Sequence, residues 1–377
     1  MSQKTYNADS ITVLKGLEPV KQRPGMYTRT EHPLHVIQEV IDNAADEAMA
    51  GFCKKIGVTL HLDGSISVSD DGRGIPVEIH PVEGVSTVEV VFTRLHAGGK
   101  FNKTDEDSAY RFSGGLHGVG VSVTNALSHR LEVEVVRDGA RHKLVFSGGD
   151  VIEALTRIGD APKKASGTSV RAWPDAKYFD APELPRAELE RLLRSKAVLM
   201  PGLEVSLAIE GGETRSWHFE HGMRGYLSEA LNDEPLIPLF AGEKFAPKGD
   251  DTFAAGEGAS WAVAWTLEGA PVRESYVNLI PTPAGGTHEA GLRDGIFTAI
   301  KNFIDHHALL PKGVKLTADD AFGRASFLLS ARVLDPSFQG QTKERLNSRD
   351  AVQLVSRMIR DPFELWLNEH VDYGKKL

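Results

Sequence analysis

Cysteine, long apolar runs and net positive charge are all scarce in this sequence of 377 residues. The single cysteine, Cys53, excludes an internal disulfide and is typical of a protein kept in a reducing cytoplasm. It follows the end of an expected helix at Gly51, where a buried thiol is more common than a reactive one. The apolar runs are too short to cross a bilayer, and the start M-S-Q-K-T-Y has no apolar signal core. We therefore expect no membrane partner and no secretory leader.

A surplus of positive charge is also missing, because the net charge is −9. This balance argues against a protein that coats nucleic acid by bulk attraction. The charge is uneven, however: residues 301–360 hold ten Lys or Arg against six Asp or Glu. That local excess is either a modest basic surface or a chance fluctuation.

The length predicts two domains, because 377 residues exceed what one ordinary core organises. In the first part, D-G pairs at 63–64 and 138–139 are hairpin signals between alternating segments. This pattern predicts helices on one face of a mixed or antiparallel sheet. The expected helices are 34–50, 85–95, one from about 118, and 187–199; the expected strands are 56–62, 65–70, 131–137, 141–147, 168–173 and, as an edge strand, 203–209.

A domain boundary is expected near 212–222, where G-G-E and H-G interrupt the pattern. Beyond it, strand and helix alternate, which predicts a βαβ crossover of right-handed sense. A loop over 335–343, D-P-S-F-Q-G-Q-T-K, joins the last strand to the last helix. The expected strands are 260–267, 274–280 and 325–333, and the expected helices are 288–307 and 348–370.

The helix at 34–50 carries the most informative pattern of the chain. Its polar residues Glu39, Asn43, Asp46 and Glu47 fall within an arc of roughly 100°. The neighbouring side of the helix is apolar and predicts a core contact. A carboxylate one turn before a carboxamide can act as a base beside a ligand of Mg²⁺, an ion that prefers oxygen donors. Taken alone, the segment is better explained as a solvated helix face, and the segments that follow reverse that preference.

Three glycine-bearing segments follow this helix. In D-D-G-R-G-I at 70–75, an acidic pair ends a strand, and Asp70 could accept a hydrogen bond from an exocyclic amine such as that of adenine. The segments 96–100 and 114–120 offer backbone amides for an anion, and Lys100 adds a charge. Neither matches a Walker A loop or a dinucleotide-binding fingerprint. An ordinary surface turn and glycines used for tight helix packing are the alternatives for the individual segments.

The order of these motifs resembles the GHKL ATPases, a superfamily that includes gyrase, a heat-shock chaperone, histidine kinases and mismatch-repair proteins. The motifs are E-x-x-x-N at 39–43, D-x-G-x-G at 70–74, G-G-L-H-G-V-G at 114–120 and G-T at 167–168. Within the superfamily the whole chain is similar to the B subunits of type II DNA topoisomerases, through Y-N-A-D-S-I at 6–11, R-P-G-M-Y at 23–27, H-A-G-G-K-F at 96–101 and Q-T-K at 341–343. Stretches such as 173–180, 196–202 and 274–280 are more similar to the topoisomerase IV branch than to gyrase.

This resemblance implies an α/β (α+β) fold in two domains. Residues 1–217 would be a GHKL ATP-binding sandwich with an N-terminal dimerisation arm. Residues 218–377 would be a transducer domain of the ribosomal S5 domain 2 type, carrying the Q-T-K loop. The family's metal-binding cleavage domain has no counterpart here, so the resemblance implies an ATPase fragment of a longer protein.

The resemblance also implies roles for individual residues in binding ATP and Mg²⁺. Glu39 would be the general base, His35 would orient it, and Asn43 would be the Mg²⁺ ligand. Gln341 and Lys343 would reach the γ-phosphate from the second domain, and Tyr6 would reach the nucleotide bound by the partner copy. The remaining implied nucleotide contacts are Glu47, Asp70, Arg73, Gly74, Ile75, Pro76, Gly99, Lys100, Tyr110, Gly115, Leu116, His117, Gly118, Val119, Gly120 and Thr168.

The implied activity is that of an ATP-operated clamp, closed by nucleotide around a DNA segment and reopened by hydrolysis. Its implied partners are a second copy of the chain, the topoisomerase IV A subunits in an A2B2 holoenzyme, duplex DNA, and ATP-competitive inhibitors of the aminocoumarin type. The implied location is the bacterial cytoplasm, at the nucleoid. Three alternatives stay open: gyrase B, another GHKL machine such as a mismatch-repair clamp or chaperone, and a nucleotide-binding module without turnover.

Overall fold

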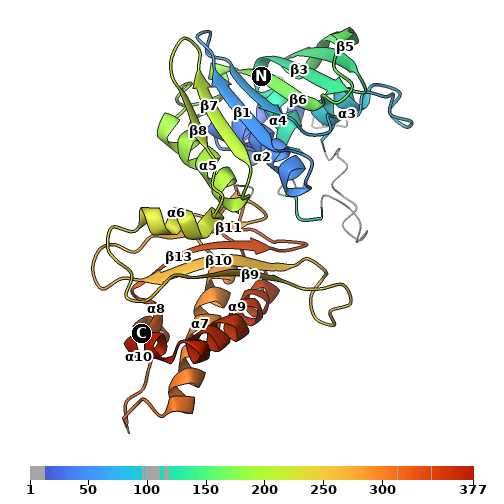
Figure 1. Cartoon of the computed structure of the whole chain (residues 1–377). Coiled ribbons are helices and arrows are strands. Elements are labelled where there is room, and N and C mark those ends of the chain that lie inside the picture. The colour runs from blue at the N-terminus through green and yellow to red at the C-terminus, as the bar shows by residue number, and fades with distance from the viewer. Residues whose placement is uncertain (1–12, 96, 98–110, 114–118, 312, 341) are drawn as a thin grey trace, which may run out of the picture.

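The computed structural model describes residues 13–95, 97, 111–113, 119–311, 313–340 and 342–377. Two sheets, one in each half of the chain, organise these residues, and Figure 1 shows them one above the other. None of the helices in the described ranges combines the length and the apolarity that crossing a bilayer requires.

Eight strands among the described residues form the first sheet, in the order β5-β4-β3-β6-β2-β1-β7-β8. All neighbours are antiparallel except β1 and β7, so the sheet is mixed, as expected. The strands are β1 (Lys55–Leu60), β2 (Ile66–Asp70), β3 (Ser128–Arg137), β4 (Ala140–Ser147), β5 (Asp150–Asp160), β6 (Gly167–Pro174), β7 (Glu204–Ile209) and β8 (Thr214–Trp217). The accompanying helices are α1 (Glu18–Gln22), η2 (Pro24–Met26), α2 (Leu34–Met49), α3 (Thr87–Thr93), α4 (Gly120–Ala126), η3 (Ala176–Tyr178) and α5 (Arg186–Leu199).

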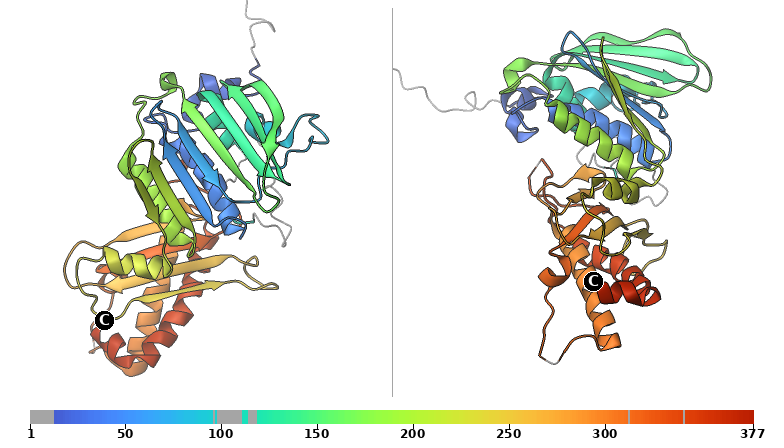
Figure 2. Two further views of the ribbon diagram at one scale, coloured as in Figure 1. Left: turned by 45° about the horizontal axis from the view of Figure 1, so that its top comes forward. Right: turned by 60° about the vertical axis from the view of Figure 1, so that its left-hand side comes forward.

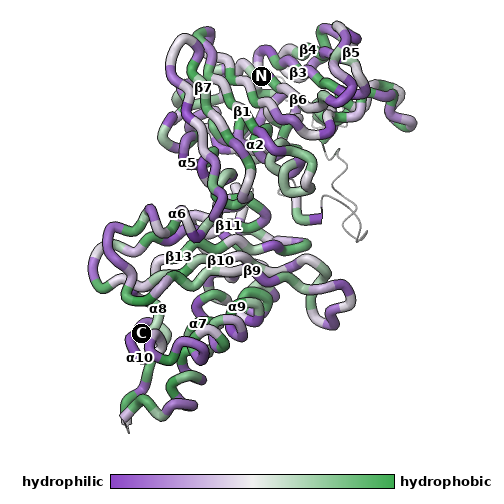
Figure 3. Tube along the Cα trace, viewed as in Figure 1, coloured by the Kyte–Doolittle hydropathy of each residue, from purple (hydrophilic) through white to green (hydrophobic). Residues whose placement is uncertain are grey.

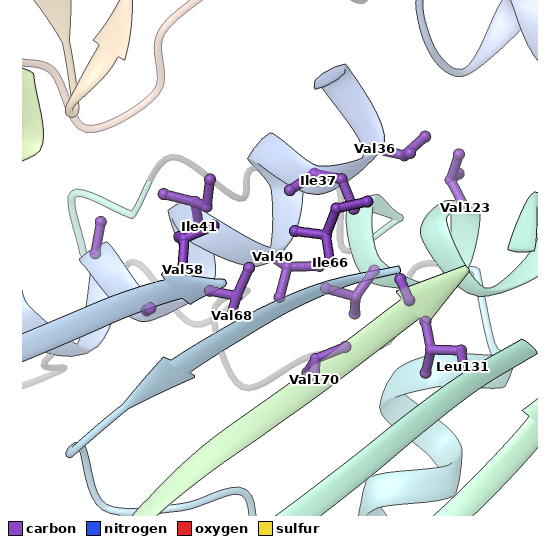
Figure 4. Packing of buried hydrophobic residues seen from close by; sticks show 14 of the residues in the cluster. Val36, Ile37, Val40, Ile41, Val58, Ile66, Val68, Val123, Leu131 and Val170 are labelled. Atoms are coloured by element: carbon purple, nitrogen blue, oxygen red, sulfur yellow. The ribbon is translucent and has the colours of Figure 1, made fainter. Parts of the chain in front are cut away.

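Helices cover one face of this sheet, and Figure 2 shows α2 and α5 behind the strands. Alternating apolar residues of the strands meet the apolar side of α2, and Figure 4 shows Ile37 and Ile41 of α2 above Val58 and Val68. Figure 3 shows the corresponding alternation of hydrophobic and hydrophilic segments along the strands. Two residues of the expected polar arc of α2 lie beside glycines of the glycine-bearing segments, Glu47 at Gly72 and Glu39 at Gly120.

The prediction that 203–209 is an edge strand was wrong. Strand β7 lies between β1 and β8, and β8 is the outer strand. Little in the sequence marks β8, because its first three residues are exposed and carry no apolar alternation. Strand β5 was missed for a similar reason, since most of its residues are exposed.

Five strands among the described residues form the second sheet, in the order β12-β11-β13-β10-β9. The parallel pairing of β11 with β13 encloses α7 between them in the chain, which is the expected βαβ unit. The strands are β9 (Phe240–Phe245), β10 (Gly258–Trp265), β11 (Arg273–Val277), β12 (Ile280–Pro281) and β13 (Ala325–Arg332). The helices are α6 (Gly222–Ala230), α7 (Thr287–His307), α8 (Ala318–Phe322), α9 (Asp350–Glu369) and α10 (Val371–Lys376).

The second sheet is buried on both faces. Trp261, Val263 and Trp265 of β10 pack toward α7 and α9, whereas Ala262 and Ala264 pack toward α6 and the first domain. Figure 1 shows α6 between the two sheets and α7 with α9 on the far side. Strands covered on both faces are continuously apolar, which explains the run A-V-A-W in β10.

Helices α7 and α9 approach closely at two glycines. An added Cβ would lie 2.6 Å from the Val352 carbonyl oxygen at Gly291 and 2.8 Å from the Ser356 carbonyl oxygen at Gly295. These positions are one helical turn apart, so they form a flat strip that admits the backbone of α9.

The thiol of Cys53 is buried, as expected. The residue is 6% exposed, and its Sγ donates to the carbonyl oxygen of Lys55 at 3.3 Å. Burial is the main cause that raises the pKa of the thiol to about 12. Cys53 is therefore a structural residue.

Candidate functional site

The half-buried carboxylate of Glu39 lies directly against the last glycine of the third glycine segment. A Cβ added at Gly120 would overlap the Glu39 Oε2 atom, so a side chain at position 120 would displace this carboxylate. Gly120 is also the first residue of α4, and the first amides of a helix point away from its body. The structure thus joins the E-x-x-x-N helix to the start of α4, two features 81 residues apart in the sequence.

His35 lies one turn before Glu39 on α2 and is buried. Its Nδ1 atom is 2.8 Å from the hydroxyl oxygen of Thr28. Burial is the largest cause that lowers the pKa of the imidazole, and the nearby positive charges of Arg29 and Lys343 act in the same direction. A neutral ring follows at neutral pH, which can hydrogen-bond at both nitrogens without adding charge.

Asp70 ends strand β2 at the side of the sheet that faces α2. Its Oδ1 atom accepts a hydrogen bond from the Gly72 amide at 2.9 Å. Burial, the largest cause, raises the pKa of the carboxyl to about 6, with the charge of Glu47 acting in the same direction. Asp70 pairs in register with Thr168 of β6, which places the two predicted adenine-site residues side by side.

Gly167 makes this pairing possible. Its φ of +149° is in the region that side chains rarely adopt, and an added Cβ would overlap the Asp70 carbonyl oxygen. The G-T motif therefore has a physical reason. The glycine lets β6 approach the end of β2, and the threonine that follows it pairs in register with Asp70.

Arg73 and Glu47 hold the first glycine segment against α2. Glu47 accepts from the Arg73 amide at 3.2 Å, from Nε at 3.1 Å and from Nη2 at 2.9 Å. The guanidinium lies 3.7 Å from the centroid of the Phe52 ring. This bidentate, stacked arrangement orients Arg73 beside Asp70 and requires arginine rather than lysine.

Of the other described residues of the predicted nucleotide site, three follow Arg73 in the chain, whereas Val119 and Asn43 lie at the start of α4 and on α2. The Ile75 amide donates to Thr168 Oγ1 at 3.3 Å, and Arg137 Nη1 donates to the Gly74 carbonyl oxygen at 2.9 Å. Pro76 is exposed, while Val119 is buried and precedes α4. Asn43 lies on α2 one turn after Glu39 and is half-buried. The predicted residues Tyr6, Gly99, Lys100, Tyr110, Gly115, Leu116, His117, Gly118 and Gln341 lie outside the described residues.

Lys343 reaches this region from the second domain. It lies in the loop between β13 and α9, is 8% exposed and has a left-handed φ of +57°. Burial is the main cause that lowers the pKa of His35, and the charge of Lys343 adds to it. The next residue, Glu344, forms an ion pair with Arg29 at 3.3 Å. A loop that nothing local marked in the sequence is therefore joined to the segment that precedes the helix of Glu39.

In a comparison with known proteins, a separate family model matches part of each half of the chain. The model described as "Histidine kinase-, DNA gyrase B-, and HSP90-like ATPase" matches residues 28–177, and the model described as "DNA gyrase B" matches residues 222–377. The B subunit of DNA topoisomerase 4 from Pseudomonas aeruginosa is 50% identical over 377 residues, and its Escherichia coli counterpart is 49% identical over 382 residues. A solved topoisomerase IV ATP-binding domain of Francisella tularensis, in complex with a small molecule inhibitor, is 42% identical with a TM-score of 0.80. That alignment covers 97% of this chain and 95% of the other.

The chain belongs to the B-subunit family of type II DNA topoisomerases. The resemblance inferred from the motifs is thereby confirmed, and so is its leaning toward the topoisomerase IV branch. The 43K ATPase domain of Thermus thermophilus gyrase B, in complex with an aminocoumarin, is also similar, at 30% identity and a TM-score of 0.78. This alignment covers 96% of this chain and 92% of that one. The first domain is accordingly a GHKL ATPase domain, which binds ATP.

The chain spans 58% of the length of each of the two curated relatives and is itself covered to 99% in both alignments. The similarity therefore extends over both sheets, whereas the relatives contain further sequence.

Two buried polar contacts of this topoisomerase B-subunit region were missed from the sequence. Ser113 donates to the Asp46 carboxylate at 2.6 Å, and Asp46 is 2% exposed. Lys196 of α5 lies 2.7 Å from the Asp42 carboxylate on α2. Neither pair has a local signature, because the partners are 67 and 154 residues apart in the sequence. The only available sign was Lys196, which occupies a position that follows the apolar spacing of Leu189, Leu192 and Leu193 on α5.

Proposed function

We propose that this chain is the ATP-operated clamp of a type IIA DNA topoisomerase, from the topoisomerase IV branch. ATP binding would close two copies around a DNA segment, and hydrolysis would reopen them, driving strand passage, relaxation and decatenation by the holoenzyme. The observation that carries the proposal is the placement of three parts: the Glu39 carboxylate on α2, the start of α4 against it at Gly120, and the loop with Lys343, which the ion pair of Glu344 with Arg29 joins to the segment before α2.

The proposed roles follow from this placement. Glu39 orients the attacking water, because its carboxylate lies where a phosphate bound at the start of α4 would be reached. His35 supports Glu39 from one turn earlier. Lys343 stabilises the charge that develops on the γ-phosphate, together with Gln341. Asp70 accepts the adenine amino group, with Thr168 beside it and Arg73 and Pro76 at the rim.

The residues present also fit Mg²⁺. Asn43 supplies an amide oxygen beside Glu39, which suits a cation that takes oxygen ligands. Among the described residues no three His, Cys, Asp or Glu side chains form a metal cage. A single protein ligand such as Asn43 is compatible with Mg²⁺, because this ion is usually bound through one or two protein ligands plus waters and substrate phosphates. When bound, the ion would neutralise phosphate charge, and Asn43 would hold it beside Glu39.

The proposed partners extend the same mechanism. A second copy of the chain would close the clamp, with Tyr6 of each arm reaching the partner's nucleotide. The topoisomerase IV A subunits would complete an A2B2 holoenzyme, and duplex DNA would be enclosed rather than coated, which is compatible with a net charge of −9. ATP-competitive inhibitors of the aminocoumarin type would occupy the Asp70 side of the site, since the similar gyrase domain is described in complex with one. The proposed location is the bacterial cytoplasm, at the nucleoid.

Coupling of nucleotide to clamp closure requires ATP to bind the closed state more tightly than the open state. A loop of the second domain that contacts the nucleotide would provide this difference, because the contact exists in only one arrangement of the domains. The buried position of Lys343 supports this view.

The experiment is Mg²⁺-dependent ATP hydrolysis measured against protein concentration. Glu39→Ala is the test variant, and Glu153→Ala, an exposed glutamate on β5, is the matched control. We expect a rate that rises faster than linearly, is lost in Glu39→Ala with nucleotide binding retained, and is unchanged in Glu153→Ala. A strictly linear rate would refute the obligatory dimer. Full hydrolysis in Glu39→Ala would refute the proposed base.

A further inference from the structure

A fully buried lysine connects the helix of Glu39 to the second domain. Lys196 lies on α5 and is 0% exposed. Its Nζ atom is 2.7 Å from Oδ1 of Asp42 and donates to the carbonyl oxygen of Leu279 at 2.6 Å. Asp42 immediately precedes Asn43 on α2 and lies three residues after Glu39, whereas Leu279 lies between β11 and β12, two strands of the second sheet. One ammonium group therefore binds both domains at once.

The Leu279 side of this contact is a rigid turn. Leu279 and Asn278 form the two-residue connection between β11 and β12, and both have left-handed backbone angles, with φ of +65° and +49°. Two consecutive left-handed residues are the mark of the tightest hairpin turns. The Leu279 side chain is 7% exposed and packs into the core of the first domain. The turn thus fills a place in the first domain with its side chain and accepts a hydrogen bond from a charged group with its backbone.

The same turn is fixed to the strand that leads to Lys343. The Asn278 amide donates to the Ala331 carbonyl oxygen at 2.9 Å. Its side chain donates to the Val333 carbonyl oxygen at 2.8 Å and accepts from the Val333 amide at 3.0 Å. Val333 is the first residue after β13, where the loop with Lys343 begins. A continuous set of contacts therefore runs from α2 through Lys196 and the β11–β12 turn to the base of that loop.

The chemistry of this contact makes it selective for one domain arrangement. A buried ammonium is costly unless it is paired and hydrogen-bonded. If the second domain moved relative to the first, Lys196 would lose its hydrogen bond to the Leu279 carbonyl oxygen and keep only the ion pair with Asp42. The Asp42 side chain is also largely buried, at 14% exposure, so each of the two charges depends on the other for its compensation.

We propose that Lys196 is a positioning residue for ATP hydrolysis. It holds α2 against the β11–β12 turn, so that Glu39 and the loop with Lys343 keep the alignment that hydrolysis requires. The expected effect on kcat rests on the proposed function, whereas the effect on domain alignment does not require ATP hydrolysis.

The test compares Lys196→Met, Asp42→Asn and the double variant in the whole chain of 377 residues. Arg191→Met, which removes an exposed cation from the same helix, is the matched control. The readouts are kcat and KM for ATP, the dissociation constant of a non-hydrolysable ATP analogue, the thermal midpoint, and a distance distribution between spin labels placed on the two domains.

We expect Lys196→Met to lower kcat at least tenfold while the analogue's dissociation constant changes less than threefold, because the Asp70 side of the site is untouched. The distance distribution should broaden. The double variant leaves no uncompensated charge, so its thermal midpoint should recover from the loss seen in Lys196→Met while kcat stays low. Arg191→Met should match the unaltered chain in every readout.

Two outcomes separate the possible failures. Wild-type kcat and an unchanged distance distribution in the folded double variant would overturn the positioning role and leave Lys196 with a purely structural one. An unaltered chain that shows no Glu39-dependent hydrolysis would refute the proposed function instead. In that case the distance distribution of Lys196→Met still tests whether Lys196 aligns the two domains, because this measurement requires no turnover. An unchanged distribution would overturn that alignment.

Discussion

Asp70 is predicted to make nucleotide affinity and stability depend on pH in opposite directions. Burial raises the pKa of its carboxyl from the ordinary 3.8 to about 6 in the nucleotide-free protein. The folded protein therefore holds this proton more tightly than the unfolded chain. The resulting contribution to stability is fully present below pH 4 and is lost as the pH rises through 6. The affinity for adenine should instead increase as the pH rises, because the ionised carboxylate accepts a stronger hydrogen bond from the amino group than the protonated carboxyl does.

The size of both effects follows from the shift. A rise of about two pKa units corresponds to roughly 3 kcal/mol of stability lost between pH 4 and pH 7. If adenine restores an ordinary pKa of about 4, the dissociation constant should fall about tenfold between pH 5 and pH 7. These magnitudes concern the Asp70 carboxyl alone and add to the titration of the phosphates and other groups.

Calorimetric titration with a non-hydrolysable ATP analogue from pH 5 to pH 7, in parallel with urea unfolding, measures both effects. Asp70→Asn is the reference, because it removes this one titration and leaves the others in place. We expect weaker binding in Asp70→Asn at every pH. We also expect the dissociation constant of the variant to change about tenfold less between pH 5 and pH 7 than that of the unaltered chain. Equal slopes in the two proteins would refute the reasoning.

Two further predictions concern glycines beside the site. Gly120→Ala should lower kcat for ATP by at least about a hundredfold with a small change in thermal midpoint, because its Cβ would displace the Glu39 carboxylate from the attacking position; steady-state kinetics would check this, and near-normal kcat would contradict the placement of Glu39. Gly286→Ala should reduce both stability and kcat, since φ is +145° there and an added Cβ would overlap the Leu346 backbone, three residues after Lys343. Unfolding and kinetics together test it, and an unchanged kcat would show that the loop tolerates this displacement.

Much of the fold was predictable because its elements are marked locally. The helix at 34–50 and the hairpins at 63–64 and 138–139 were expected, and the structure contains α2, β1 with β2, and β3 with β4 at these places. Each has an apolar periodicity or a D-G turn that needs no knowledge of the partner. Strand β8 lacks such a pattern, because its exposed residues pair with β7 at the outer edge of the sheet.

The site divides along the same line. Glu39, Asn43 and Asp70 are marked by motifs, and the structure places Glu39 against Gly120 and Asp70 beside Thr168. Their individual catalytic and binding roles stay predictions. The contacts of Lys196 with Asp42 and Leu279 depend instead on how α5 and a distant turn pack together, and no segment of the sequence records that packing.

The state of Cys53 has a practical consequence for testing the motion of the proposed clamp. A thiol with a pKa of about 12 is almost wholly protonated at neutral pH, and at 6% exposure it is shielded from maleimide reagents. Since the chain has no other cysteine, new ones can be introduced singly on either domain and labelled without first removing the native residue. Fluorescent or paramagnetic labels could therefore report opening and closure while the buried Cys53 stays in place.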